Sequence, residues 1–416
     1  MLVKRNGSFR NLYFGQLFSV FGDWIKTISL IGFVFHLTGS ANATGILFLL
    51  AIIPQITVSF FSGPFIDKFN KKKLIIYLDF IRFVLGIALV FSVYLEQLLL
   101  GLAIVFITNV FSAIFIPARS AFIPQIIDKD DIVAANNILL VSFNVTMAVS
   151  TAIGGVILAF LGTHNVLLLS AFMYLLSAVF VFFVKYTPST EKVFEQTSYV
   201  KQLKEGYSLV KESSLLKSTF LMNGMRDFVT GAVNIMFNTI ILTHFLMGDT
   251  GIAYGYTATA VGFLALGLIA KKFIKKSVLE NQNKLANFSL TMVTLYGVLL
   301  AVTFSLNNFW FFLVFILLMN IPQGLLNISF ESSVMHNATD THKGRVFAFL
   351  MTFTRLGYVF GLLMFIALSS VLSVSQYGWL LCLLLVLTGI INKKIHSTNV
   401  EEKPLVSSNE VYTHEG

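Results

Sequence analysis

The hydrophobic positions of this 416-residue chain gather in long runs, and short polar stretches separate them. A helix crosses the roughly 30 Å hydrocarbon layer of a bilayer with about 20 residues. Twelve runs reach that length, at about residues 11–37, 44–66, 74–94, 98–118, 134–161, 165–185, 216–246, 251–270, 286–305, 308–330, 345–370 and 375–391. The pattern predicts an all-α integral membrane protein with twelve transmembrane helices. The runs at 134–161 and 345–370 are expected to bend, because Asn, Ser, Thr and Gly interrupt them.

The composition supports a membrane protein. The chain is 56% hydrophobic and 12% charged, and its mean hydropathy is +0.81, whereas soluble domains are about 25% charged. The net charge of +9 does not indicate a nucleic-acid partner, because the Lys and Arg residues cluster in short linkers and form no basic face with interleaved aromatic residues.

The charge of the linkers alternates along the chain. No Lys or Arg occurs in the connections near 38–43, 95–97, 162–164, 247–250, 306–307 and 371–374. The alternate connections and both ends carry them, which by the positive-inside rule predicts that both termini are cytoplasmic. The first run is longer than the apolar core of a signal peptide, so we expect it to remain as the first helix.

A polar stretch of mixed charge between the sixth and seventh runs predicts how the chain is divided. The expected parts are an N-terminal six-helix bundle at 1–185, a cytoplasmic linker at 186–215, a C-terminal six-helix bundle at 216–391 and a disordered cytoplasmic tail at 392–416. A faint internal repeat supports this division. A shift of 204 residues aligns Asp23 with Asp227, Gly63 with Gly267, Lys68 with Lys272 and Lys71 with Lys275. Two such bundles, related by an axis along the membrane normal, are typical of one class of secondary transporters.

The loop after the second run carries a motif, Gly63-x-x-x-Asp67-Lys68-x-Asn70-Lys71. It resembles the loop signature of the major facilitator superfamily, with Asn70 where a glycine is usual; Asn tolerates the left-handed backbone of a tight turn. The resemblance implies a cytoplasmic gate, held shut when Asp67 pairs with an arginine after helix four and with the start of helix eleven. The expected gating residues are Gly63, Asp67, Lys68, Lys71, Arg119, Gly344 and Arg345. The simpler alternative is that the lysines only keep the loop on the cytoplasmic side.

Three shorter stretches narrow the resemblance: "FIPARSAFIPQIIDKDDIVAANN" at 115–137, "FGDW" at 21–24 and "GRV" at 344–346. They are similar to the branch of the superfamily that holds macrolide efflux proteins and enterobactin exporters. Two features depart from drug antiporters. Ser150 and Thr151 stand where the helix-five motif has Gly-Pro, and the arginine of helix four is missing, with Asn109 in its neighbourhood. Both departures count against antiport and not against transport.

Several charged residues lie well inside the apolar runs, where an ionisable group is costly and indicates function. They are Asp23, Lys26, Asp79, Arg82, Arg226, Asp227 and Arg355. Asp23 and Lys26 are three residues apart and share a helical face, on a helix that lines the cavity in the superfamily. Asp23 is the first candidate for the proton site, and Asp227 is its repeat partner. The alternative is a permanent Asp23–Lys26 pair, which would keep the acid ionised. Asp79 and Arg82 are expected to be scaffold.

The same set of charges bears on the cargo. Four cations and three anions suit neutral, zwitterionic or anionic compounds better than a cationic drug. The residues expected to bind substrate are Phe21, Trp24, Lys26, Asn109, Arg226, Asn234, Asn320 and Arg355. For the asparagines, hydrogen bonding between helices is the alternative.

Other classes of protein lack support in the sequence. The seven histidines are scattered, and no H-E-x-x-H, P-loop or G-x-S-x-G stretch occurs, so neither an enzyme, a metal site nor a cofactor is expected. The lone Cys382 is expected to be a packing residue. The expected function is export of small amphipathic compounds (a drug, a macrolide-like compound, or a siderophore or peptide metabolite) by proton antiport with alternating access, as in multidrug resistance. Proton-coupled uptake by symport and a non-transporting membrane sensor are the alternatives. We expect a monomer in a bacterial cell membrane, with substrate, protons and lipid as its partners.

Overall fold

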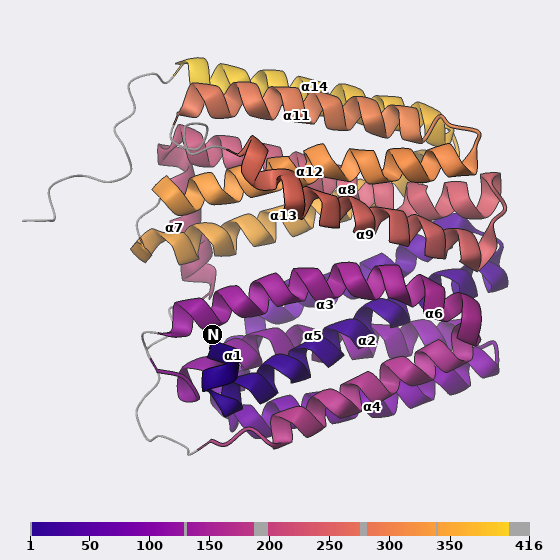
Figure 1. Ribbon diagram of the computed structural model, residues 1–416, viewed down its shortest axis with the longest axis vertical. Helices are drawn as coiled ribbons and strands as arrows, with labels where there is room; N and C mark the ends of the chain where they lie inside the picture. Colours follow the sequence, from indigo (N-terminus) through magenta and orange to yellow (C-terminus); the bar gives the residue numbers. More distant parts are fainter. Residues whose placement is uncertain (1, 129–130, 187–198, 275–280, 338–339, 399–416) are drawn as a thin grey trace, which may run out of the picture. The chain divides into compact units, whose positions relative to one another are not determined.

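The computed structural model describes residues 2–128, 131–186, 199–274, 281–337 and 340–398, and within these ranges the chain is helical with no strand (Figure 1). It divides into two compact units. Unit 1 comprises Met1–Phe194 and Ile241–Ala260, and unit 2 comprises Glu195–Ile240 and Val261–Gly416.

Unit 1 is built around its two longest helices, which pack against each other. Its elements are α1 (Leu2–Arg5), α2 (Gly7–Thr38), α3 (Ala41–Asp67), α4 (Lys71–Tyr94), α5 (Leu98–Phe122), the short 3-10 helix η1 (Ile123–Gln125) and α6 (Ile132–Phe182). Side-chain oxygens start two of them, since Asn6 accepts from the backbone N–H of Phe9 and Asn70 from that of Lys73. The helix α6 packs along α2 and α4, and α5 packs on α3 and α4. This arrangement brings the interior faces of α2, α4 and α6 together.

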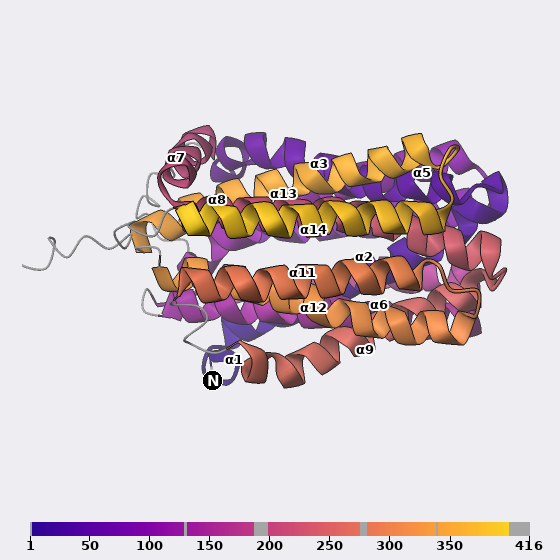
Figure 2. The ribbon, with the colours of Figure 1, turned by 90° about the horizontal axis from the view of Figure 1, so that it is seen from above.

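Unit 2 holds most of the second half of the chain. Its elements are α7 (Tyr199–Glu212), α8 (Ser214–Thr239), α11 (Gln282–Thr303), α12 (Phe309–Asn337), α13 (Asp340–Leu368) and α14 (Val374–Thr398). The helix α9 (Gly248–Phe273) begins in unit 1 and ends in unit 2, and the π-helix η3 (Ile240–His244) precedes it. The helix α8 packs on α13, α14 and α12, and α11 runs beside α14, as Figure 2 shows.

A single glycine divides α6 into two helices. Gly162 has φ 74° and ψ 165°, a conformation that is essentially restricted to glycine. The break falls between the two runs predicted at 134–161 and 165–185, so α6 corresponds to the fifth and sixth predicted helices. The chain therefore reverses here with hardly any loop.

The predicted fold class is confirmed. With α6 divided at Gly162, each of the twelve predicted runs overlaps a helix. Among the described residues, nine helical segments have the length and hydropathy to cross a membrane. They do not include α3, the first part of α6 or α8, so the number of twelve spans stays a prediction.

Two helical segments lie where the sequence reading expected polar linker and tail. The helix α14 continues past residue 391 to Thr398, and α7 forms within the stretch 186–215. Apolar residues recur along α7 at helical spacing, at Val200, Leu203, Tyr207 and Val210. Val210 packs in a cluster with residues of α8 and α13, and the ring of Tyr207 lies 5.9 Å from that of Phe349 on α13. The described part of the linker is thus a docked amphipathic helix.

Candidate functional site

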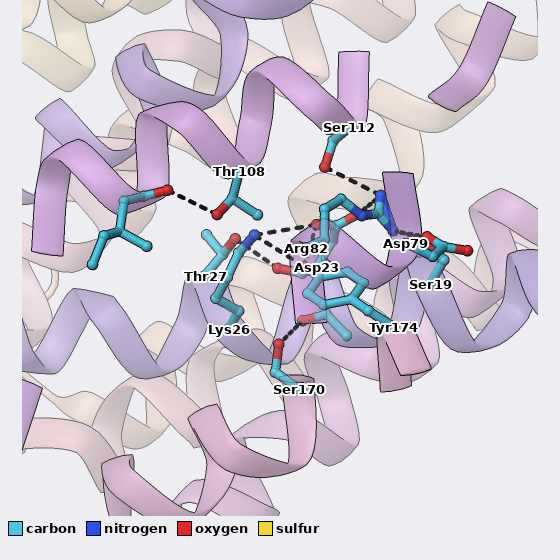
Figure 3. A network of polar contacts seen from close by, with 12 residues as sticks. Ser19, Asp23, Lys26, Thr27, Asp79, Arg82, Thr108, Ser112, Ser170 and Tyr174 are labelled. Carbon is cyan, nitrogen blue, oxygen red and sulfur yellow. Dashed lines mark hydrogen bonds and ion pairs between the residues drawn. The ribbon is translucent and has the colours of Figure 1, made fainter. Parts of the chain in front are cut away.

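Four charged side chains meet in the interior of unit 1 (Figure 3). Asp23 and Lys26 come from α2, and Asp79 and Arg82 come from α4. Within each pair the residues are three apart, so both side chains lie on one face of their helix. Because α2 and α4 both pack on α6, the two pairs face a common centre, where Tyr174 of α6 joins them.

Arg82 is the centre of this cluster. Its side chain is 1% exposed, its Nη2 lies 2.8 Å from Asp79 Oδ1, and its Nη1 lies 3.9 Å from Asp23 Oδ2. The guanidinium also donates hydrogen bonds to Ser19 and Ser112. It stacks over the ring of Tyr174 at 4.3 Å, an attractive contact between a cation and an aromatic face. Arg82 therefore ties α2, α4, α5 and α6 together.

Asp79 is completely buried. It accepts hydrogen bonds from Arg82 at 2.8 Å and from Ser177 of α6 at 2.5 Å. A buried charge is tolerated only when it is paired and hydrogen-bonded, and both conditions are met. The geometry supports the scaffold role expected for Asp79 and Arg82.

Asp23 differs from Asp79 in its access to solvent. Its side chain is 32% exposed, and it accepts hydrogen bonds from the Tyr174 hydroxyl at 2.6 Å and from Lys26 Nζ at 3.2 Å. Lys26 is buried and donates to the Tyr174 hydroxyl at 3.0 Å. Of the two acids in the cluster, only Asp23 can exchange a proton with water without disruption of the core.

The charges of the cluster balance when all four groups are ionised, with two carboxylates and two cations. A proton on Asp23 would leave one positive charge in excess, close to buried Lys26 and Arg82. The cluster can thus couple a proton at Asp23 to the charge that the site presents. The expected Asp23–Lys26 pair is present as well, and the proton-carrying role of Asp23 stays a prediction.

The turn between α3 and α4 shows what one of the expected gating residues does. Lys71 is buried, and its Nζ donates to the backbone oxygens of Ile66 at 2.9 Å and Phe69 at 3.2 Å. A cation at these carbonyls stabilises the C-terminal end of α3. Lys68 is exposed, and Arg119 of α5 donates a hydrogen bond to Gln16 of α2.

The cytoplasmic latch itself stays a prediction. Its other residues lie outside the set whose surroundings the structure describes: Gly63, Asp67, Gly344 and Arg345.

In unit 2 the predicted residues fall into separate environments. Arg226 donates to the carboxylate of Asp227 through Nε at 2.9 Å and through Nη2 at 2.7 Å. Asn234 of α8 donates to the Tyr358 hydroxyl of α13 at 2.7 Å. Asn320 is buried and donates to a carbonyl of its own helix at 2.8 Å, and its contact with a substrate stays a prediction.

The remaining predicted substrate residues are spread over three helices. Phe21 and Trp24 are partly buried on α2, Asn109 is buried on α5, and Arg355 is partly buried on α13. The contact of these four residues with a substrate stays a prediction.

Sequence reasoning missed the partners that come from other helices. Tyr174, Ser177 and Ser19 complete the cluster, yet each lies far along the chain from the charged residue that it contacts. The pairs found from the sequence were those whose members share one helix. A tyrosine in the interior of the sixth run was the one available signal, because a buried hydroxyl needs a hydrogen-bond partner.

Comparison with known proteins places this chain in a family. A family model described as transmembrane secretion effector, of the major facilitator type, matches residues 4–415. The putative bacilysin exporter BacE of Bacillus subtilis (strain 168) is 24% identical, covering 83% of this chain and 84% of the relative. The staphyloferrin A transporter of Staphylococcus aureus (strain NCTC 8325 / PS 47) is 24% identical, covering 82% and 84%. A third relative, the uncharacterized MFS-type transporter YvqJ of Bacillus subtilis (strain 168), is 26% identical, and the match spans 51% of this chain and about half (52%) of YvqJ.

Solved structures agree on the fold. The nucleoside transporter NupG, in a mutant form, superposes with a TM-score of 0.68 at 13% identity, covering 94% of this chain and 98% of NupG. A transporter of the POT family in complex with a thioalcohol-conjugated peptide gives 0.69 at 12% identity, covering 95% and 96%. The resemblance seen in the sequence motifs is confirmed, and the chain, a transporter and not an enzyme, belongs to the transmembrane secretion effector family of the major facilitator superfamily.

Proposed function

We propose that this protein exports small amphipathic compounds from a bacterial cell by proton antiport with alternating access. The family is described as a secretion effector, and BacE is described as a putative exporter. The observation that carries the proposal is the environment of Asp23, which is the solvent-accessible acid in an otherwise buried and charge-balanced cluster.

Antiport requires that proton and substrate exclude each other, and Asp23 offers a way to do so. Its carboxylate oxygens accept from Lys26 and Tyr174 and remain partly open to water. A positive or hydrogen-bond-donating group of the substrate would use the same oxygens as the proton. Binding of either would weaken binding of the other, so a higher proton concentration outside the cell would drive release of the substrate there. The two six-helix halves would then rotate as rigid bodies about the binding site, which would open it to one side of the membrane at a time.

Uptake by proton symport is the second candidate, and one observation favours it. Lys26 is buried and donates to both Asp23 and Tyr174. A proton on Asp23 would release this cation, and an anionic substrate could then pair with it. Proton and substrate would bind together, which is the requirement for symport.

Inside-out membrane vesicles distinguish these mechanisms. A deletion strain is first screened for increased sensitivity to a panel of antibiotics that includes macrolides, which supplies a test compound. Vesicles acidified inside should then accumulate that compound and lose part of their proton gradient when it is added. Symport would instead give accumulation with an alkaline interior, and a protein that only senses would accumulate nothing.

The Asp23→Asn variant tests the proton site. It should bind the compound more weakly, because the neutral amide stands in for the protonated acid. It should still exchange the compound down its own gradient, but accumulation should no longer respond to the proton gradient. Glu96→Gln is the matched control, since Glu96 is an exposed acid in the turn between α4 and α5, and it should behave as the unaltered protein. Proton-driven accumulation that persists in Asp23→Asn would end the proposal.

A further inference from the structure

Unit 2 contains a second polar arrangement, which the proton site does not use. It is a ladder of three hydrogen-bonded pairs between α8 and its neighbours α12 and α13. Its members, which we call the polar seam, are Arg226 with Asn327, Thr230 with Gln323, and Asn234 with Tyr358. The Thr230–Gln323 bond is 3.1 Å and the Asn234–Tyr358 bond is 2.7 Å.

The spacing of the seam makes it a continuous stripe. Its three residues on α8 are four apart, at Arg226, Thr230 and Asn234, so they lie one above another on one face. Gln323 and Asn327 are also four apart on α12 and pair with α8 in reverse order. At 1.5 Å per residue the stripe runs for about 12 Å along α8. It is therefore long enough for several groups of one ligand.

The seam is open, in contrast to the asparagines of α8 that lie beyond its two ends. The side chains of Arg226 and its neighbour Asp227 are 17% and 23% exposed. Asn223 and Asn238 are buried and donate to carbonyls of their own helix. Polar groups with a purely structural role are shielded in this way. Partly exposed ones at membrane depth indicate a water-filled cavity.

The seam also has hydrogen-bonding capacity to spare. Asn327 Oδ1, Gln323 Nε2 and Asn234 Nδ2 are used within the ladder. The other half of each amide, Asn327 Nδ2, Gln323 Oε1 and Asn234 Oδ1, makes no hydrogen bond with another described residue. An amide group both donates and accepts. The stripe thus presents a donor and two acceptors in a row to whatever occupies the cavity.

The charge of the seam is balanced. Arg226 is the one charged member of the seam, and the adjacent Asp227 neutralises it through two hydrogen bonds at 2.9 and 2.7 Å. The other members of the seam are neutral. A ligand with a net charge would gain no net attraction and would lose its hydration. An extended zwitterion could place its carboxylate at the Arg226 end of the seam, near the guanidinium and Asn327 Nδ2, and its ammonium group at the other end, near Asn234 Oδ1. Its amides would then meet the amide of Gln323 between the two ends.

We propose that the polar seam is the subsite for a ligand that carries both signs of charge and no net charge, is rich in amide groups and has the length of about three extended peptide residues. This inference rests on the proposed transport function and names the class of its substrate.

The test is equilibrium binding to the purified full-length protein in detergent, with three probes of equal length. Trialanine is zwitterionic, trialanine amide carries one positive charge, and N-acetyl-trialanine carries one negative charge. Binding is measured from the rise in melting temperature with probe concentration. We expect trialanine to bind about tenfold more tightly than either charged form, as for the loss of one hydrogen bond to a charged group.

Asn327→Asp changes the charge of the seam at nearly constant shape. It adds one negative charge beside Arg226, so the preference should move by about tenfold from trialanine towards trialanine amide. Gln323→Glu adds the same charge one helical turn away and should move the preference in the same direction, which covers a failure of Asn327→Asp to fold. Ser329→Ala is the control, because Ser329 lies on the same helix and bonds only a carbonyl of that helix.

Three outcomes overturn the inference: no binding of trialanine to the unaltered protein, equal binding of the three probes, or unchanged preference in both acidic variants. The measurement uses no proton gradient, so it is independent of the proposed antiport. If the protein prefers trialanine but shows no proton-driven export, the inference about the seam stands and the proposed function is refuted. If it shows proton-driven export but no preference for trialanine, the proposed function stands and the inference about the seam is refuted.

Discussion

Replacement of Asp79 by leucine should be one of the most destabilising single changes in unit 1. The substitution removes both acceptor oxygens from a site that is 0% exposed. Arg82 then keeps its charge at 1% exposure, with only the carboxylate of Asp23 left, at 3.9 Å. The folded state is destabilised because a buried cation has lost its closest counter-charge.

The size of the effect follows from two lost hydrogen bonds. Arg82 donates to Asp79 at 2.8 Å and Ser177 donates to it at 2.5 Å. A hydrogen bond to a charged group contributes about 1.5–3 kcal/mol, so their sum is about 3–6 kcal/mol. Breaking a buried pair costs about 3–5 kcal/mol. We expect a loss near 4 kcal/mol, which is roughly a thousandfold in the folding equilibrium.

The double variant Asp79→Leu/Arg82→Leu serves as the control. It removes both buried charges, and Ser19, Ser112 and Ser177 can turn to carbonyls of their own helices. Its unfolding free energy, measured by denaturant titration in detergent micelles, should lie within about 2 kcal/mol of the unaltered protein. If the single variant is as stable as the unaltered protein, or the double variant is less stable than the single one, the pair is not the scaffold described above.

Two further predictions concern the backbone and the linker. Gly162→Ala should lower the free energy of unfolding by about 1–3 kcal/mol. The loss comes from backbone strain alone, because nothing lies within 4 Å of the added Cβ. Gly39→Asn is the control: at φ 63° and ψ 5° it should be nearly neutral, since Asn accepts that conformation. Equal melting temperatures of the two variants would contradict this reasoning. Phe349→Ala removes the ring beneath Tyr207 and should make α7 several times more sensitive to limited proteolysis. Phe91→Ala, at an exposed ring of α4, should not. Equal cleavage of all three proteins would show that α7 does not depend on this contact.

The helices were largely predictable from the sequence because the bilayer sets the length of each apolar run. The boundary at Gly162 was also visible, as a short polar gap between two long runs. The helix α7 was missed because the stretch 186–215 was judged by its average polarity. Its apolar residues, from Val200 to Val210, are too few to change that average but recur at helical spacing.

The candidate sites were predictable only in part. Contacts within one helix were predictable from residue spacing, and contacts between helices were not. Asp23 with Lys26, and Asp79 with Arg82, are neighbours on one helix, so their spacing alone revealed them. Tyr174 reaches Asp23 across 151 positions of the chain, and no local pattern reports such a contact. The polar seam has the same origin, since the pairing of α8 with α12 depends on how each helix is rotated about its axis.

The docked position of α7 makes this connecting segment sensitive to any movement of α8 relative to α13. Its inner face is held by α8 and α13, while Lys204 on its outer face is exposed. If α13 shifts past α8, α7 must either move with one of them or detach from it. Both events change the surroundings of the outer residues of α7. A fluorescent dye attached at position 204 would therefore report such a shift in real time, without a label in the membrane or a known cargo.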